Sequence, residues 1–194
     1  MPTIIDYPRV LARMTDEGLC CNYPNSGAFG FPPAAGAHIL GWIGPDDPTI
    51  KPAMRSQLKI FPAPYESNLA AAALDVWQSV LPGLAWVMPS SHWHFELHDG
   101  SRAWMPAALD EIKIDPAHLT FRPDGSALEF HPHETAAFSH WLEALLTGLS
   151  VSDFVLAFPG RPVLCMIHHH KQLWWTFTDP AWRDRINRPA PPTS

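Results

Sequence analysis

The sequence predicts an α+β fold, with a mainly antiparallel sheet that carries about three helices and is preceded by a Gly/Pro-rich irregular arm. Strand-like and helical segments alternate without a regular strand-helix-strand repeat, which argues against a doubly wound parallel sheet. Several strand-like runs are joined by short turn sequences, which is typical of antiparallel pairing. With 194 residues, 46% of them hydrophobic, the chain can form one core. We expect one domain over residues 1–188.

The first third of this domain contains the arm. Residues 22–56 are dense in glycine and proline, which interrupt helices and remove backbone donors, so we expect them to be largely irregular. Within the arm, the apolar run 37–43 is bounded by glycines and predicts a short strand. Residues 57–61 predict a second strand, and apolar residues at helical spacing predict a helix over 67–80.

The remaining elements follow from periodicity and turn signals. The apolar run 84–88 and the alternating run 92–98 predict strands, and Pro106 favours a helix over 106–112 because proline is tolerated in a first turn. Pro123-Asp124-Gly125-Ser126 predicts a hairpin turn between strands 119–122 and 127–130. The clearest helix spans 132–148, and three further strands over 154–158, 162–167 and 173–178 form a meander. The Pro-rich end over 189–194 is expected to be disordered.

The charge content limits the classes of partner. Charged residues make up 16% of the chain, below the roughly 25% usual for soluble domains. A surface with few charges is typical of proteins that bind partners or self-associate. The formal net charge of −6 argues against nucleic-acid binding, which needs a cationic surface. We therefore expect another protein or a second copy as the partner.

Cysteine usage and hydropathy indicate the compartment. Three cysteines do not make a disulfide framework, which favours a reducing environment. The N-terminal residues lack the basic and apolar regions of a signal peptide, and no apolar run approaches the roughly 20 residues needed to cross a bilayer. We expect a cytoplasmic protein that does not enter a membrane.

The run His92-Trp93-His94-Phe95-Glu96-Leu97-His98 carries the candidate metal ligands. If it is a strand, its imidazoles and carboxylate share one face, because alternate side chains point the same way. Neighbouring imidazole and carboxylate groups can bind a transition metal such as zinc or iron once further ligands are added. His168 and His170 are the candidate additional ligands. The interpretation that we favour is a hydrated sheet face or a contact with a helix, and a metal is implied only under the alternative interpretation.

Tryptophan residues are the candidate partner contacts. The chain has 9 tryptophans, too many for all of them to be buried in a domain of this size. Trp174 and Trp175 are adjacent on a predicted strand, so they face opposite sides of the sheet. With Trp42 in the arm, they are the residues that we expect to bind a protein partner. Cys165 lies in an apolar run, where a buried and inert thiol is expected.

The sequence favours a non-catalytic binding or accessory protein that acts through a protein-protein interface. No P-loop, dinucleotide fingerprint, zinc-protease helix or nucleophile elbow is present among its motifs. Two alternatives stay open. One is a metal-dependent enzyme that uses the His/Glu face described above, and the other is a small-molecule binding module.

Overall fold

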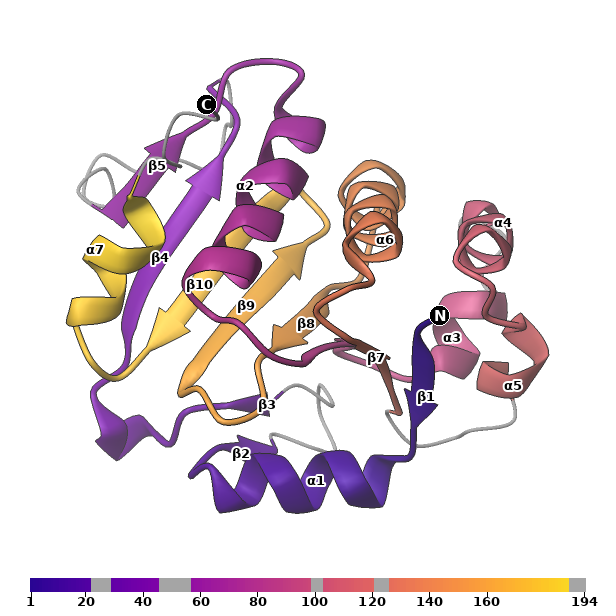
Figure 1. The fold of residues 1–194 in the computed structure, drawn as a ribbon, viewed down its shortest axis with the longest axis horizontal. Helices are drawn as coiled ribbons and strands as arrows, with labels where there is room; N and C mark the ends of the chain where they lie inside the picture. The colour runs from indigo at the N-terminus through magenta and orange to yellow at the C-terminus, as the bar shows by residue number, and fades with distance from the viewer. Residues whose placement is uncertain (22–28, 46–56, 99–102, 121–125, 189–194) are drawn as a thin grey trace.

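A mixed eight-stranded sheet organises the chain (Figure 1). The computed structural model describes residues 1–21, 29–45, 57–98, 103–120 and 126–188. The strand order is β1-β7-β6-β8-β9-β10-β4-β5, and only the pair β4-β5 is parallel. The strands of this sheet are β1 Thr3–Ile5, β4 His38–Ile43, β5 Leu58–Ile60, β6 Ala85–Pro89, β7 Ala127–Phe130, β8 Phe154–Ala157, β9 Val163–His168 and β10 Gln172–Phe177. A separate two-stranded ribbon pairs β2 Cys20–Cys21 with β3 Phe29–Gly30.

Seven α-helices and one short 3-10 helix, Pro33–Ala35, accompany the sheet in the described part of the chain. The α-helices are α1 Tyr7–Asp16, α2 Tyr65–Ser79, α3 Trp93–His98, α4 Trp104–Glu111, α5 Pro116–Thr120, α6 Thr135–Gly148 and α7 Ala181–Asn187. The α+β class is therefore confirmed, with more helices than the roughly three expected. No helix among the described residues is both long enough and apolar enough to span a membrane.

One face of the sheet is covered by α2 and α6, which lie side by side in front of the strands in Figure 1. Their apolar stripes pack on every second residue of the strands, because alternate side chains of a strand share a face. Trp77 of α2 and Phe138 of α6 pack together with ring centroids 4.4 Å apart. Trp175 and Trp42 reach the same core from neighbouring strands, with centroids 5.2 Å apart.

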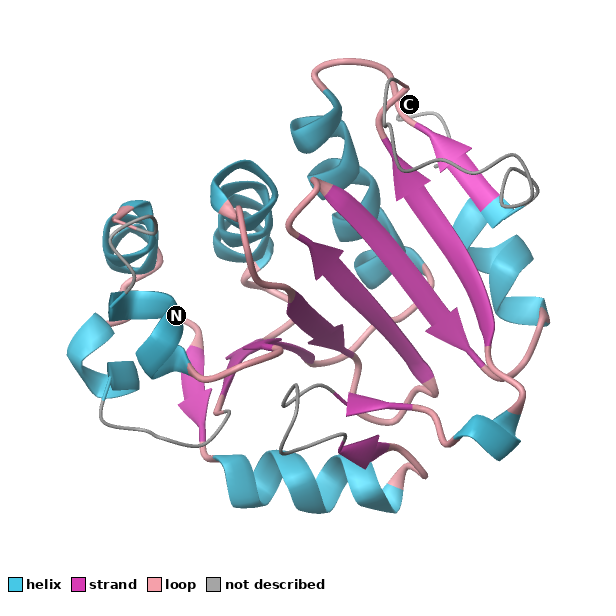
Figure 2. Ribbon diagram, turned by 180° about the vertical axis from the view of Figure 1, so that it is seen from behind, coloured by secondary structure: helices cyan, strands magenta, loops and turns pink. Residues whose placement is uncertain are grey.

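The described residues cover the opposite face over only part of its width. Val10 and Met14 of α1 and Phe29 of β3 pack on Trp86 and Met88 of β6, which forms a second and smaller core. This core also includes residues of β7 and β8, so α1 and the ribbon cover the β7-β6-β8 side of the sheet. Figure 2 shows that no described helix crosses the same face over β9, β10, β4 and β5.

Most of the predicted elements are present. The strands expected over 37–43, 57–61 and 84–88 correspond to β4, β5 and β6, and the C-terminal meander is β8-β9-β10. The helices expected over 67–80, 106–112 and 132–148 are α2, α4 and α6, with shifted boundaries. The arm is less irregular than expected, because β3 and the 3-10 helix precede the expected strand β4. The rest of the arm, 22–28 and 46–56, and the tail 189–194 lie outside the described residues.

The prediction of a strand over 92–98 is wrong, because Trp93–His98 forms α3. Among the described side chains of this helix, Trp93 and Glu96 are buried, and they share a helical face because they are three residues apart. Trp93 packs against Phe154 with ring centroids 5.5 Å apart and donates its indole N–H to the carbonyl of Ser126 at 2.6 Å. Seven residues of alternating polarity were too short a run to distinguish a strand from two turns of helix.

The predicted hairpin over 119–130 is also wrong in its first strand. Leu119 and Thr120 lie in α5, while β7 pairs with β1 on one side and β6 on the other. Three of the four residues that suggested the turn, Pro123, Asp124 and Gly125, lie outside the described residues. The partners of β7 come from residues distant in sequence, which a local turn signal does not reveal.

Candidate functional site

The main candidate site is an apolar groove of about 560 Å³ on the face of the sheet that no helix of the described residues covers. We call it the sheet groove. Its walls come from β9, β10, β4 and β5, with Val155 of β8 and Phe29 of β3 at one side. The apolar lining residues are Phe29, Ile39, Ile43, Leu58, Val155, Leu164, Met166 and Trp174, and the polar ones are His168, His170, Gln172 and Thr176.

Strand alternation explains why the sheet groove is apolar. On β10, Trp175 points into the core under α2 and α6, so its neighbours Trp174 and Thr176 point into the groove. Both faces of these strands carry apolar side chains, although the described helices cover only one of them. Trp174 is partly exposed, and its indole N–H donates to the Gln172 side-chain oxygen at 2.6 Å.

Gly41 of β4 keeps the floor of the groove open. A Cβ built at this position would lie 2.7 Å from the Leu58 side chain and 2.7 Å from the Trp174 ring. Contacts this short are not tolerated, so a side chain at Gly41 would displace one of them. The absence of a side chain at position 41 therefore lets the Trp174 ring lie across β4.

The apolar surface continues from the groove to the edge of the sheet. Ile39 of β4 is 42% exposed and Ile60 of β5 is 57% exposed, both high values for large apolar side chains. Leu58 and Ile60 share a face of β5 because they are two residues apart. β5 is the last strand of the sheet in the described part of the chain. An apolar face therefore meets a strand edge here.

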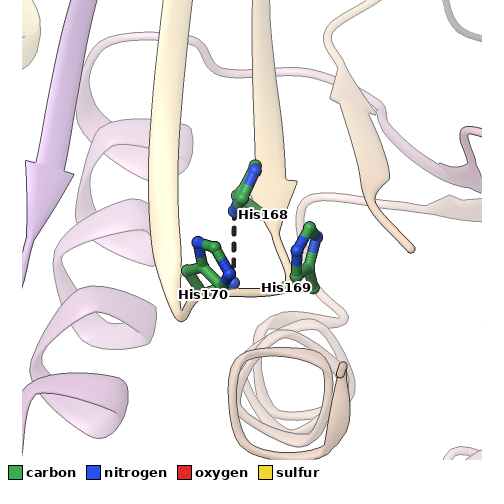
Figure 3. Close-up of side chains that lie close together, drawn as sticks. All are labelled: His168, His169 and His170. Carbon is green, nitrogen blue, oxygen red and sulfur yellow. Dashed lines mark hydrogen bonds between the residues drawn. The ribbon is translucent and has the colours of Figure 1, made fainter. Parts of the chain in front are cut away.

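The end of β9 and the turn to β10 form the polar end of the groove, and they carry three consecutive histidines (Figure 3): His168 ends β9, and His169 and His170 follow in the turn. Asp153 accepts hydrogen bonds from the His169 backbone N–H at 3.0 Å and from the His169 ring Nδ1 at 2.8 Å. The second oxygen of Asp153 lies 4.0 Å from His168 Nε2. The His170 backbone N–H donates to His168 Nδ1 at 3.1 Å.

An ion pair connects this turn to α2. Lys171 Nζ lies 2.7 Å from Glu66 Oε1 and 5.9 Å from the centre of the Tyr65 ring. The hydrogen bond to Lys171 lowers the pKa of Glu66 below 4.5, and the same bond raises the pKa of Lys171 above 10.5. Lys171 has a φ of 61°, in the left-handed region that a tight turn requires.

We expect the loss of stability caused by Glu66→Gln to depend on pH. Because the Glu66 pKa is lowered on folding, its stabilisation is present above pH 4.5 and is lost as the pH falls through the folded pKa. The raised Lys171 pKa sets the other limit, since that stabilisation is lost only as the pH rises above 10.5. Denaturant unfolding near neutral pH should show that the variant loses about 0.5–1 kcal/mol of unfolding free energy. The loss is small because the Lys171 side chain is 37% exposed and solvent screens the ion pair. An equal difference in unfolding free energy between the wild type and Glu66→Gln at pH 3 would contradict the ion-pair explanation.

The candidate metal ligands on α3 do not form the predicted face. His94 and His98 are exposed and lie on consecutive turns, with ring centroids 4.6 Å apart and ring planes tilted by 58°. Glu96 points the other way and is 1% exposed, where it accepts hydrogen bonds from Ser91 Oγ at 2.6 Å and Ser152 Oγ at 2.7 Å. His92 precedes the helix. Among the described residues, only His168, His169 and His170 form a group with metal-binding spacing, and none of the α3 residues belongs to it.

The three tryptophans predicted to bind a partner differ in position. Trp42 and Trp175 are both 0% exposed and lie in the main core, so neither can contact a partner. Trp174 lines the sheet groove, and its role in binding stays a prediction. Cys165 is fully buried, and burial raises the pKa of its thiol well above the ordinary value, which disfavours the thiolate that a nucleophile needs.

Comparison with known proteins gives no relative for this chain. No protein-family model matches it, and no curated protein or solved structure matches it significantly. The function must therefore be argued from the site itself.

Sequence reasoning did not find the sheet groove. Its signal is present in the chain, since strands 163–168 and 172–177 carry apolar or aromatic side chains at successive positions and not only at alternate ones. Such strands are expected to be covered on both faces. Only the arrangement of the helices reveals that no helix in the described part of the chain lies over one of these faces.

Proposed function

We propose that this chain is a binding protein that holds an apolar segment of another polypeptide in the sheet groove. The observation that supports this proposal is the continuous apolar surface from Met166 and Trp174 to the exposed Ile39 and Ile60. Exposed apolar patches of this kind mark interaction sites in soluble proteins. Aromatic and methionine side chains, both present in this groove, are enriched in interfaces.

The strand edge favours a polypeptide as the ligand. An extended segment that pairs with an edge strand gains main-chain hydrogen bonds, and its alternate side chains enter pockets on one face of the sheet. Here β5 supplies the edge, and Leu58 and Ile60 supply the adjacent apolar face. The segment would need apolar side chains at every second residue to fit this arrangement.

A small apolar molecule is a second candidate ligand, and the volume of the groove supports it. Ligand pockets commonly measure about 300–1,000 Å³ and combine an apolar lining with a few polar groups. The groove, at about 560 Å³, lies in this range, and its polar groups gather at the end formed by His168, His170 and Gln172.

Site-specific photo-crosslinking in the native cells distinguishes the two ligands. A photoreactive amino acid at Thr176, which lines the groove, is expected to yield a covalent adduct with a polypeptide. The matched control places the same amino acid at Gln78, an exposed residue of α2 on the opposite side of the sheet. Mass spectrometry of the adducts identifies the partner and shows whether it is a second copy of this chain.

The outcomes separate clearly. A polypeptide adduct from Thr176 and none from Gln78 supports the proposal. An adduct of a few hundred daltons from Thr176 supports the small-molecule alternative instead. Equal adducts from both positions, or none from either, would refute binding in the groove.

A further inference from the structure

We infer that the turn between β9 and β10 binds a divalent transition-metal ion through His168, His169 and His170. One ligand nitrogen from each of these rings lies within 4.8 Å of the other two. The ring centroids are 4.2 Å apart for His168 and His169, and 4.3 Å apart for His169 and His170. Imidazole nitrogen is the preferred donor for zinc, nickel and copper. This inference does not depend on the proposed groove ligand.

Small side-chain rotations would close the site. Tetrahedral zinc with Zn–N bonds of about 2.0–2.1 Å places its ligand nitrogens roughly 3.3 Å apart. The three ligand nitrogens now lie within 4.8 Å of one another, so each pair needs to approach by no more than about 1.5 Å. His168 and His169 are only partly buried and His170 is exposed, so these rotations do not disturb the core.

Asp153 orients the ring of His169. Its carboxylate accepts the Nδ1 hydrogen bond of His169, which leaves Nε2 of that ring for a metal ion. Carboxylates that hold metal-binding histidines in this way fix the ring orientation and increase ligand basicity. The other Asp153 oxygen lies 4.0 Å from His168 Nε2, which is too far for a hydrogen bond. The His168 ring is connected to the turn instead through its Nδ1, which accepts the His170 backbone N–H at 3.1 Å.

The three rings supply three ligands, and a tetrahedral ion takes a fourth. His168 and His170 both line the sheet groove, so the fourth position opens toward its polar end. Water or a donor atom of a bound molecule can complete the coordination there.

Metal titration of the untagged chain tests this inference. We expect one Co²⁺ or Zn²⁺ per chain, and the visible spectrum of the Co²⁺ form should show the strong absorption of tetrahedral coordination. His170→Ala removes an exposed ligand without disturbing the core and should weaken binding at least about tenfold. His140→Ala is the matched control, because His140 is an exposed histidine of α6 that pairs with Glu111 instead.

Asp153→Asn distinguishes a built site from three flexible histidines. The metal affinity of a flexible triple-histidine stretch would not depend on residue 153. In a built site, loss of a carboxylate that orients the metal ligands lowers the metal affinity about 10- to 100-fold. Thermal unfolding without metal checks that this variant is folded. No stoichiometric binding by the wild type, or equal affinity for the wild type, His170→Ala and Asp153→Asn, would overturn the inference. Crosslinking from the sheet groove would be unaffected by that result.

Discussion

Trp175→Ala is expected to lower the free energy of unfolding by about 3–5 kcal/mol, while Trp174→Ala lowers it by only about 1 kcal/mol. Trp175 is 0% exposed and packs against Trp42 and Phe158, with ring centroids 5.2 Å and 6.1 Å away. Its removal leaves a cavity in the core. Trp174 lies partly exposed in the sheet groove, where water can replace the ring.

Denaturant unfolding of the two variants measures the difference. The pair is well matched because the residue type, the strand and the substitution are the same, and only the face of the sheet differs. Equal losses of stability would mean that both faces of β10 are covered, and the sheet groove would not be an accessible surface.

Glu96→Ala is expected to lower the free energy of unfolding by about 2–3 kcal/mol. It removes a buried carboxylate that accepts hydrogen bonds from two serines, so both hydroxyl groups lose their acceptor. His94→Ala should change the stability by no more than about 0.5 kcal/mol, since this side chain is exposed. The difference follows from α3, in which residues 94 and 96 lie on different sides of the helix.

Chemical denaturation of these two variants also tests the assignment of α3. On a strand, His94 and Glu96 would share one face and have similar surroundings. Similar losses of stability for both variants would therefore contradict the helix. Glu96→Gln is a useful control, because its amide oxygen can still accept a hydrogen bond from one serine.

The sequence predicted the α+β class and the C-terminal half best. The long periodic helix over 132–148 and the three strands that follow it depend on local patterns, and α6 and β8-β9-β10 confirm them. The errors fall where a pattern was short. The run His92–His98 is compatible with two periodicities, and its tertiary partners Trp141 and Phe154 decide in favour of a helix.

The candidate site was only partly predictable. Adjacent residues of a strand face opposite ways, so the sequence could place Trp174 and Trp175 on different faces. It could not tell which of them lies under helices, because α2 and α6 are distant in sequence from β10. Likewise, the contact of Asp153 with His169 depends on β8 lying beside β9, which is a property of the sheet order.

The yield of photo-crosslinked polypeptide from Thr176, measured in the Ile39→Asp background, tests the proposed role of the groove most directly. Ile39 is an exposed groove residue, so a carboxylate there should leave the fold intact and lower the yield about tenfold, as expected for a loss of about 1.4 kcal/mol of binding free energy. Val151→Asp is the matched control, because Val151 is also exposed but is not among the lining residues. We expect this control to keep the wild-type yield, and an undiminished yield with Ile39→Asp would contradict binding in the sheet groove.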